Sequence, residues 1–212
     1  MTTTWVTGLT MVIVAYLLGS FPTAQVVARR RGKDIREIGD GNMGSSNVLR
    51  NFGIKAGVRV FLVDLFKGTA AILLAQWMEL PAVWQFASGT GAVLGHDFPV
   101  WARFKGGQGL ATTTGVFLGL WPLPGAIGLV IFGLLYLLTH NKDLATALGM
   151  VQLLGNTWIN GEPPMGLIFI VGLLLFIPLK KWLDKPRREK ILAEEAKEQD
   201  GLDLNRGDLR DN

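Results

Sequence analysis

The apolar residues of this chain are gathered into long blocks, a pattern that a water-soluble domain of this size does not normally have. A helix that spans a bilayer needs roughly 20 mostly apolar residues. The first block, from Trp5 to about Ala28, meets that length by itself. Basic residues follow this block and none precedes it, so it predicts a spanning helix rather than a signal peptide.

Further apolar stretches cover the chain as far as Leu179. They occupy residues 58–78, 83–101, 110–139, 144–159 and 165–179. The third of these is too long for one span, and the run Trp121-Pro122-Leu123-Pro124-Gly125 divides it into two, of which Leu110–Leu120 is short. Short segments are compatible with a membrane where the bilayer thins or neighbouring protein shields them. The predicted fold class is therefore all-α, a polytopic membrane protein with seven transmembrane helices.

Lysine and arginine are confined to alternate connections between these segments. Those after the first, third and fifth segments contain Arg29, Arg30, Arg31, Lys33, Arg36, Arg50, Lys55, Arg59, Arg103, Lys105 and Lys142, and the tail after the seventh is basic as well. The intervening connections, 79–81, 121–125 and 160–164, contain neither residue. The positive-inside rule then predicts an N-terminus outside and a cytoplasmic C-terminus.

This pattern divides the chain into two parts. Residues 1–183 are predicted to form a single membrane domain with its site on the cytoplasmic face, and residues 184–212 a charged cytoplasmic tail. Charges spaced four apart predict a helix over 188–197. The polar end, 201–212, is predicted to be disordered.

Composition excludes several kinds of site. The chain has no cysteine and only two histidines, His96 and His140, so neither a thiolate nor a multi-histidine metal site is expected. The net charge of +4 is carried by the loops that face the cytoplasm, which favours anionic membrane lipid over nucleic acid as the partner. No metal and no cofactor are predicted.

The first basic loop, residues 34–50, has the composition of an anion site. Three glycines lie within six residues and leave backbone N–H groups open to a ligand: Gly39, Gly41 and Gly44. Ser45, Ser46 and Asn47 are expected to cap a helix that begins near Val48, and Arg50 adds a fixed positive charge. An ordinary loop with a helix cap explains the same residues equally well.

The second basic loop, residues 95–114, repeats this chemistry. Lys105 is followed by Gly106, Gly107 and Gly109, and threonines begin the next helix. The lysine precedes the glycines, so the loop is not a Walker A motif. The alternative is a glycine-rich juxtamembrane turn with positive-inside lysines. Two such loops on one face favour a shared phosphate site.

Three ionisable residues lie within or beside the predicted spans. Asp64 and Lys67 are spaced i and i+3 on one helix, where a structural ion pair is favoured over a catalytic one. His96, at the cytoplasmic end of the third segment, is predicted to be either a base or a phosphate donor, or else a hydrogen-bonded structural residue.

In order, these motifs resemble the bacterial acyl-phosphate:glycerol-3-phosphate acyltransferase family, whose members have seven helices and an external N-terminus. The resemblance covers about residues 11–115. It is carried by Tyr16–Pro22 in the first helix, by Asp34–Arg36 with Gly39–Arg50, by Asp64–Gly68, and by Gly95–Thr112.

Three departures from the family pattern are visible. Asp40 stands where the family usually has serine, and Gln108 replaces the second lysine of Lys-Gly-Gly-Lys-Gly. The family's third motif has histidine, asparagine and glutamate after the last helix. Here residues 178–188 offer lysines and arginines, with Asp184 and Glu189 as the nearby acids.

The resemblance implies transfer of a fatty acyl group from acyl phosphate to the 1-hydroxyl of glycerol 3-phosphate, giving lysophosphatidic acid. This reaction of phospholipid biosynthesis needs no coenzyme or metal, and the implied location is the cytoplasmic side of the bacterial inner membrane. The implied catalytic residues are Asp40, Arg50, His96 and Lys105. The implied substrate-binding residues are Gly41, Asn42, Gly44, Ser45, Ser46, Asn47, Lys67, Gly106, Gly107, Gln108, Gly109 and Thr112.

Two roles are open for Asp40: it takes the proton of the acceptor hydroxyl, or it holds Arg50 or Lys67 in place. Arg50 and Lys105 are expected to bind phosphate, and the N–H groups near Gly106 an oxyanion. A non-catalytic family member that binds an anionic lipid or phosphate at the cytoplasmic face is the alternative. A transporter is disfavoured, because only Asp64 and Lys67 lie clearly within spans.

Overall fold

The computed structural model describes residues 2–208, and within that range the secondary structure is entirely helical. The elements are α1 (Thr2–Gly19), α2 (Thr23–Arg29), η1 (Ile35–Glu37), α3 (Ser45–Phe52), α4 (Ile54–Trp77), α5 (Ala82–Asp97), η2 (Val100–Ala102), α6 (Leu110–Leu120), α7 (Pro122–Thr139), α8 (Lys142–Ile159), α9 (Pro164–Leu183) and α10 (Lys185–Asp208).

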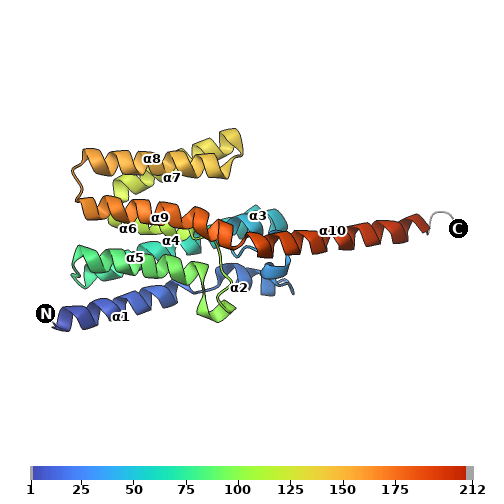
Figure 1. Ribbon diagram of the computed structural model, residues 1–212, viewed down its shortest axis with the longest axis horizontal. Helices are drawn as coiled ribbons and strands as arrows, with labels where there is room; N and C mark the ends of the chain where they lie inside the picture. Colours follow the sequence, from blue (N-terminus) through green and yellow to red (C-terminus); the bar gives the residue numbers. More distant parts are fainter. Residues whose placement is uncertain (1, 209–212) are drawn as a thin grey trace.

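The long helices run back and forth along one axis (Figure 1). α1 packs against α5, α4 against α6, and α7 against α8, while α9 contacts both α5 and α8. The N-terminus lies at one end of the bundle. α2 and α3 lie at the opposite end, and α10 projects beyond that end (Figure 1). All of the glycine-rich motif residues therefore belong to one end of the molecule.

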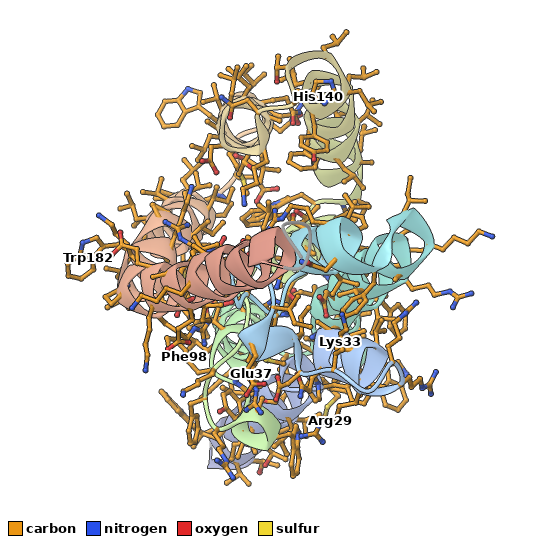
Figure 2. All side chains as sticks on the ribbon, turned by 90° about the vertical axis from the view of Figure 1, so that its right-hand side faces the viewer. Arg29, Lys33, Glu37, Phe98, His140 and Trp182 are labelled. Carbon is orange, nitrogen blue, oxygen red and sulfur yellow. The ribbon has the colours of Figure 1, made fainter. Side chains whose placement is uncertain are left out.

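The apolar segments behave largely as the sequence predicts. Each forms helix, which confirms the all-α class. Three stretches are long and apolar enough to cross a bilayer: Thr3–Arg29, Pro122–Thr139 and Pro164–Glu194. Their outer faces carry exposed apolar side chains, and only 6% of the α7 stretch is buried. Trp182 of α9 is 67% exposed and points away from the bundle, as a side chain at a lipid interface does (Figure 2).

The first apolar block is not one continuous helix. α1 ends at Gly19 and α2 begins at Thr23, so the predicted span is present but is not the single continuous helix expected from Trp5 to Ala28. Pro22 has no N–H, so it cannot continue the hydrogen-bond ladder of α1, and it occupies the N-cap position of α2. The break turns the chain into the first loop.

The end of the chain is more helical than predicted. α10 covers Lys185–Asp208, so the helix extends at both ends beyond the predicted range 188–197, and residues 209–212 lie outside the described part. Pairs of opposite charge four residues apart support the first half of this helix: Lys185 lies 3.7 Å from Glu189, and Lys190 lies 3.8 Å from Glu194.

Glycines bring two pairs of helices into backbone contact. A β-carbon at Gly115 of α6 would lie 1.9 Å from the carbonyl oxygen of Leu65 in α4, and one at Gly95 of α5 would lie 2.1 Å from that of Tyr16 in α1. No side chain fits in either place. Close contact through small residues is the usual way in which helices pack in membranes, where the hydrophobic effect does not drive association. The end of α5 is thereby fixed against α1, and the start of α6 against α4.

We predict that Gly115→Val destabilises the folded protein, whereas Gly172→Val does not. A valine at 115 forces α6 away from Leu65, and overpacking of this kind costs roughly 1–3 kcal/mol or more. Gly172 of α9 is the matched control, because a β-carbon there would meet no other atom within 4 Å. Thermal unfolding of both variants in detergent measures the difference, and equal melting temperatures would contradict the backbone contact.

Candidate active site

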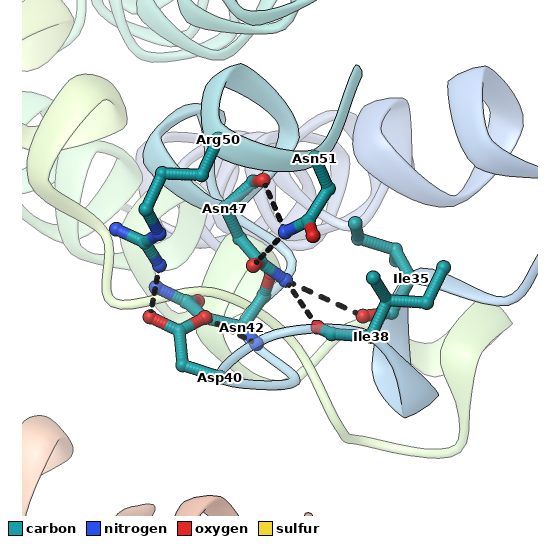
Figure 3. A network of polar contacts seen from close by, with 7 residues as sticks. All are labelled: Ile35, Ile38, Asp40, Asn42, Asn47, Arg50 and Asn51. Carbon is teal, nitrogen blue, oxygen red and sulfur yellow. Dashed lines mark hydrogen bonds and ion pairs between the residues drawn. The ribbon is translucent and has the colours of Figure 1, made fainter. Parts of the chain in front are cut away.

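The first loop is organised around one buried asparagine, Asn47 of α3 (Figure 3). Its side-chain nitrogen lies within hydrogen-bonding distance of three carbonyl oxygens, those of Ile35 at 3.4 Å, Ile38 at 2.9 Å and Asn42 at 3.1 Å. These residues come from both sides of the glycine-rich turn. A single side chain therefore holds the whole loop against the start of α3.

The backbone and side-chain oxygen atoms of Asn47 accept hydrogen bonds as well. Asn51 donates its side-chain amide to the Asn47 carbonyl at 3.0 Å and to Asn47 Oδ1 at 2.9 Å (Figure 3). A β-carbon at Gly39 would lie 2.5 Å from Asn47 Oδ1, and Gly39 has a positive φ of 59°. Asn47 thus builds the loop, and the substrate-orienting role that the resemblance implies stays a prediction.

The helix that follows this loop begins earlier than predicted. α3 starts at Ser45 with Gly44 as its N-cap, so the prediction that Ser45, Ser46 and Asn47 cap a helix from Val48 is wrong. The reason is that the Asn47 side chain turns back to the loop carbonyls. The two serines are left lining the cavity described below.

Asp40 and Arg50 form an ion pair across the first loop. Arg50 Nη2 donates to Asp40 Oδ2 at 2.5 Å, and the Asn42 N–H donates to Asp40 Oδ1 at 3.2 Å (Figure 3). The Asp40 side chain is 18% exposed and that of Arg50 50%. The contact with Arg50 is the one that the second of the two predicted roles of Asp40 requires.

A second ion pair fixes the beginning of the loop. Asp34 accepts from the Arg36 N–H and from Nε, both at 2.9 Å, and caps η1. These bonds from Arg36 lower the pKa of Asp34 from 3.8 to about 2. Since the folded-state pKa is depressed, the pair stabilises the loop above about pH 4, and this contribution is lost as the pH falls toward 2.

Lys67 of α4 is buried where the first helix breaks. Its ammonium donates to the carbonyl oxygens of Gly19 at 3.0 Å and Phe21 at 3.1 Å, and lies 2.8 Å from Asp64 Oδ1. Thr23 donates to the same carboxylate oxygen at 3.0 Å. The predicted ion pair is therefore present, and its ammonium group also satisfies the Gly19 carbonyl, which the end of α1 leaves without an intrahelical partner.

His96 joins this buried cluster from α5. Its Nδ1 lies 3.3 Å from Lys67 Nζ. An ammonium group can only donate, so Nδ1 is the acceptor, and the proton of a neutral ring sits on Nε2. A β-carbon at Gly107 would lie 2.1 Å from Nε2, which places this nitrogen directly beneath the second loop. His96 is thus arranged as a hydrogen-bond donor.

The glycines of the second loop pack on the end of α5. The Gly107 N–H donates to the His96 carbonyl at 3.1 Å, and a β-carbon at Gly106 would lie 2.2 Å from that same oxygen. Gly109, with a φ of 69°, is the N-cap of α6. Lys105 is exposed and does not line the cavity described next.

A cavity of about 750 Å³ lies between the first loop, α4 and the helices α7, α8 and α9. One part of its wall is polar and is lined by Asn42, Gly44, Ser45, Ser46, Asp64, His96, Gln108, Gly109, Lys142, Asp143 and Lys181. The other part is apolar and is lined by Leu129, Phe132, Met150, Leu154, Leu174 and Ile177, among others. Such a cavity suits a ligand with a polar head and a long apolar tail.

The cavity brings together only part of the predicted site. Predicted residues outside its lining are Asp40, Gly41, Asn47, Arg50, Lys67, Lys105, Gly106, Gly107 and Thr112. Thr112 is buried at the contact of α6 with α4, where its carbonyl faces Gly68. Sequence reasoning missed Lys142 and Lys181 as site residues, since charge was their only signal. In the described chain, no group of three or more His, Asp or Glu side chains could hold a metal.

A family model described as glycerol-3-phosphate acyltransferase matches residues 9–188. The chain belongs to this family. A glycerol-3-phosphate acyltransferase of Prochlorococcus marinus (strain NATL1A) is 38% identical over 176 residues, which cover 80% of this chain and 89% of the relative. One from Moorella thermoacetica is 37% identical over 180 residues, covering 83% and 90%.

Solved structures of the integral membrane glycerol 3-phosphate acyltransferase PlsY (YgiH) have the same fold. Its glycerol 3-phosphate form superposes with a TM-score of 0.77 at 31% identity, over 85% of this chain and 91% of that chain. Its lysophosphatidic acid form gives a TM-score of 0.75. The resemblance drawn from the motifs is confirmed, and it extends well beyond residue 115. This glycerol-3-phosphate acyltransferase is a membrane enzyme, and the non-catalytic alternative is not favoured.

We predict that Asn47→Asp loosens the first loop and lowers the melting temperature. The aspartate has nearly the same shape but no N–H₂, so the carbonyls of Ile35, Ile38 and Asn42 lose their donor. Each buried group left without a partner costs roughly 1–3 kcal/mol.

Asn160→Asp is the matched control, because Asn160 is exposed and its side chain bonds only to the neighbouring Asn156. Differential scanning fluorimetry gives the melting temperatures, and limited proteolysis reports cleavage between residues 34 and 44. Equal behaviour of the two variants would show that Asn47 does not hold the loop.

Proposed function

We propose that this acyltransferase uses acyl phosphate as its donor and the 1-hydroxyl of glycerol 3-phosphate as its acceptor, and that the reaction takes place in the cavity beside the first loop. The observation that carries the proposal is the division of that cavity into a polar and an apolar part. The similar PlsY structures are described in a glycerol 3-phosphate form and a lysophosphatidic acid form, which supports the same acceptor and product here.

The reaction requires no covalent bond between the protein and a substrate. The acceptor oxygen attacks the acyl carbonyl carbon, the bond from that carbon to the phosphate oxygen breaks, and inorganic phosphate leaves with the electron pair. The departing phosphate takes up the hydroxyl proton. The enzyme must therefore hold two anionic substrates in line and stabilise the oxyanion formed between them.

The polar part of the cavity offers groups for both tasks. Gly44, Ser45 and Ser46 present backbone N–H groups and hydroxyls at the start of α3, where the helix dipole also favours an anion. The Nε2 proton of His96 and the amide of Gln108 are further donors for a phosphate or the oxyanion. We assign Asp40 to positioning Arg50, whose guanidinium then binds phosphate at the rim of the cavity.

The apolar part of the cavity suits the fatty acyl chain. Its walls come from α7, α8 and α9, and the opposite face of α7 is almost entirely exposed. The donor would thus be held by its tail in the membrane domain and by its phosphate at the loops.

We further propose that seven helices cross the membrane, with the N-terminus outside and the site on the cytoplasmic face of a bacterial inner membrane. The termini lie at opposite ends of the bundle, and the basic loops lie at the same end as the site (Figure 1). Lys33 and Arg29 belong to this end, which faces the viewer in Figure 2. This asymmetry of charge supports the orientation.

Purified enzyme is expected to release phosphate and form lysophosphatidic acid only when palmitoyl phosphate and glycerol 3-phosphate are both supplied. Arg50→Ala should lower kcat/KM by about a hundredfold or more, as removal of one donor to a developing charge typically does. Arg59→Ala is the control, because Arg59 is an exposed residue of α4 outside the cavity lining. No product from folded protein would exclude acyl phosphate as the donor.

The topology can be mapped with single cysteines, because the chain has none of its own. In intact cells whose outer membrane has been removed, Glu162→Cys should react with a membrane-impermeant maleimide, since it follows α8 at the outer end. Lys190→Cys in α10 should react only after lysis. Labelling of both positions in intact cells would exclude the proposed orientation.

A further inference from the structure

The polar part of the cavity lacks positive charge from the motif residues. On the proposed function, it has to accept two phosphate-bearing substrates. Gln108 lines it where the family has lysine and is neutral. Arg50 lies outside the lining and pairs with Asp40, and Lys67, also outside the lining, pairs with Asp64, which does line the cavity. Among the described residues of the two loops, no lysine or arginine lines the cavity.

Two lysines from later helices line the same cavity. Lys142 begins α8, and Lys181 lies near the end of α9. Lys181 Nζ lies 2.6 Å from Asp143 Oδ2, an ion pair that joins the two helices at the cavity. Both lysines lie in connections whose positive charge is already accounted for by the predicted membrane topology. The fold brings them opposite the first loop.

The ammonium group of Lys142 has no hydrogen bond or ion pair within the described part of the chain. It is near enough to Asp40 and Arg50 to interact with their charges, so the first loop and the start of α8 face each other across the rim. Asn141 fixes this turn, because its side-chain oxygen accepts from the N–H groups of Asp143 at 3.1 Å and Leu144 at 3.0 Å. The backbone that carries Lys142 is therefore well defined.

The position of Lys142 conflicts with the usual placement of charge along a helix. A cation in the first turn is disfavoured by the helix dipole, which attracts anions at that end. Asp143 offsets this only in part, since its carboxylate is engaged by Lys181. A doubly charged anion bound beside Lys142 removes the conflict, and local rules are most often broken at functional sites.

We propose that Lys142 and Lys181 form a phosphate-binding pair that supplies the positive charge absent at Gln108. The ligand is the phosphate group of a substrate, either that of the acyl donor or that of glycerol 3-phosphate. Lys142 binds it directly. Lys181 binds it from the neighbouring helix α9, while its pairing with Asp143 keeps α8 and α9 together. This inference rests on the proposed function for the identity of the substrates.

The test is steady-state kinetics of Lys142→Gln and Lys181→Gln with each substrate varied in turn. KM for one of the two substrates should rise by about tenfold to a hundredfold, as expected for the loss of a charge-assisted hydrogen bond. A rise for glycerol 3-phosphate assigns the pair to the acceptor, and a rise for palmitoyl phosphate assigns it to the donor. Lys142→Arg, which keeps the charge, should retain most of the affinity.

The most specific part of the test is a second substitution that restores the lost positive charge. Gln108→Lys restores a cation to the other wall of the same cavity, so combining it with Lys142→Gln should recover a large part of the lost affinity. Lys190→Gln is the matched control, because Lys190 is 77% exposed on α10 and outside the lining. The proposal is overturned if neither KM changes in Lys142→Gln, or if Lys190→Gln has the same effect.

Binding measurements test the lysine pair independently of whether acyl phosphate is the acyl donor in the reaction. If the wild-type enzyme shows no turnover with palmitoyl phosphate, the proposed reaction fails, but calorimetric titration of glycerol 3-phosphate and of palmitoyl phosphate, each alone, still tests the lysines. Weaker binding of either compound to Lys142→Gln at an unchanged melting temperature supports the pair. Unchanged affinity for both compounds overturns it.

Discussion

The fold of this acyltransferase depends on one buried ammonium group, that of Lys67. It bonds to the carbonyl of Gly19, which the end of α1 leaves open, and to that of Phe21, and it pairs with Asp64 on its own helix. A buried charge is tolerated only when it is paired and fully hydrogen-bonded, and here the partners come from three helices. Without Lys67 the break at Pro22 would leave the Gly19 carbonyl unpaired inside an apolar bundle. With it, the chain can leave α1, turn through α2 and enter the first loop.

The same ammonium group orders the second loop, because it fixes the ring of His96 through Nδ1 and leaves Nε2 beneath Gly107. The first loop is held separately by Asn47, so the two loops reach the cavity by independent means. Rigid helices carry both, since α5 contacts α1 and α6 contacts α4 through glycines that admit no side chain. Preorganised donors of this kind are what transfer to a hydroxyl group requires.

Much of this arrangement could be predicted from the sequence, because helix length, apolar blocks and charge asymmetry are local properties. The break at Pro22 is visible as a proline but is hidden within a block of otherwise suitable length. The roles of single side chains are harder to predict. From the sequence alone, Asn47 is predicted to be a helix cap or a substrate-binding residue. Its contact with Ile35, 12 residues away, is visible only in the folded structure. Lys142 and Lys181 are separated in sequence from both motifs, so only the packing of α8 and α9 makes them part of the cavity.

The apolar walls of the cavity belong to helices that also form the outer surface of the molecule. α7 contributes Leu129 and Phe132 to the cavity, packs against α8, and carries exposed apolar side chains such as Leu123, Val130 and Leu137 on its outer face. On the proposed function, an acyl donor dissolved in the bilayer is then separated from its binding site by the thickness of a single helix pair. The quantity that governs saturation of such an enzyme is the mole fraction of donor in the membrane rather than its concentration in water. Dilution with inert lipid should slow the reaction even when the total amounts of enzyme and donor stay the same.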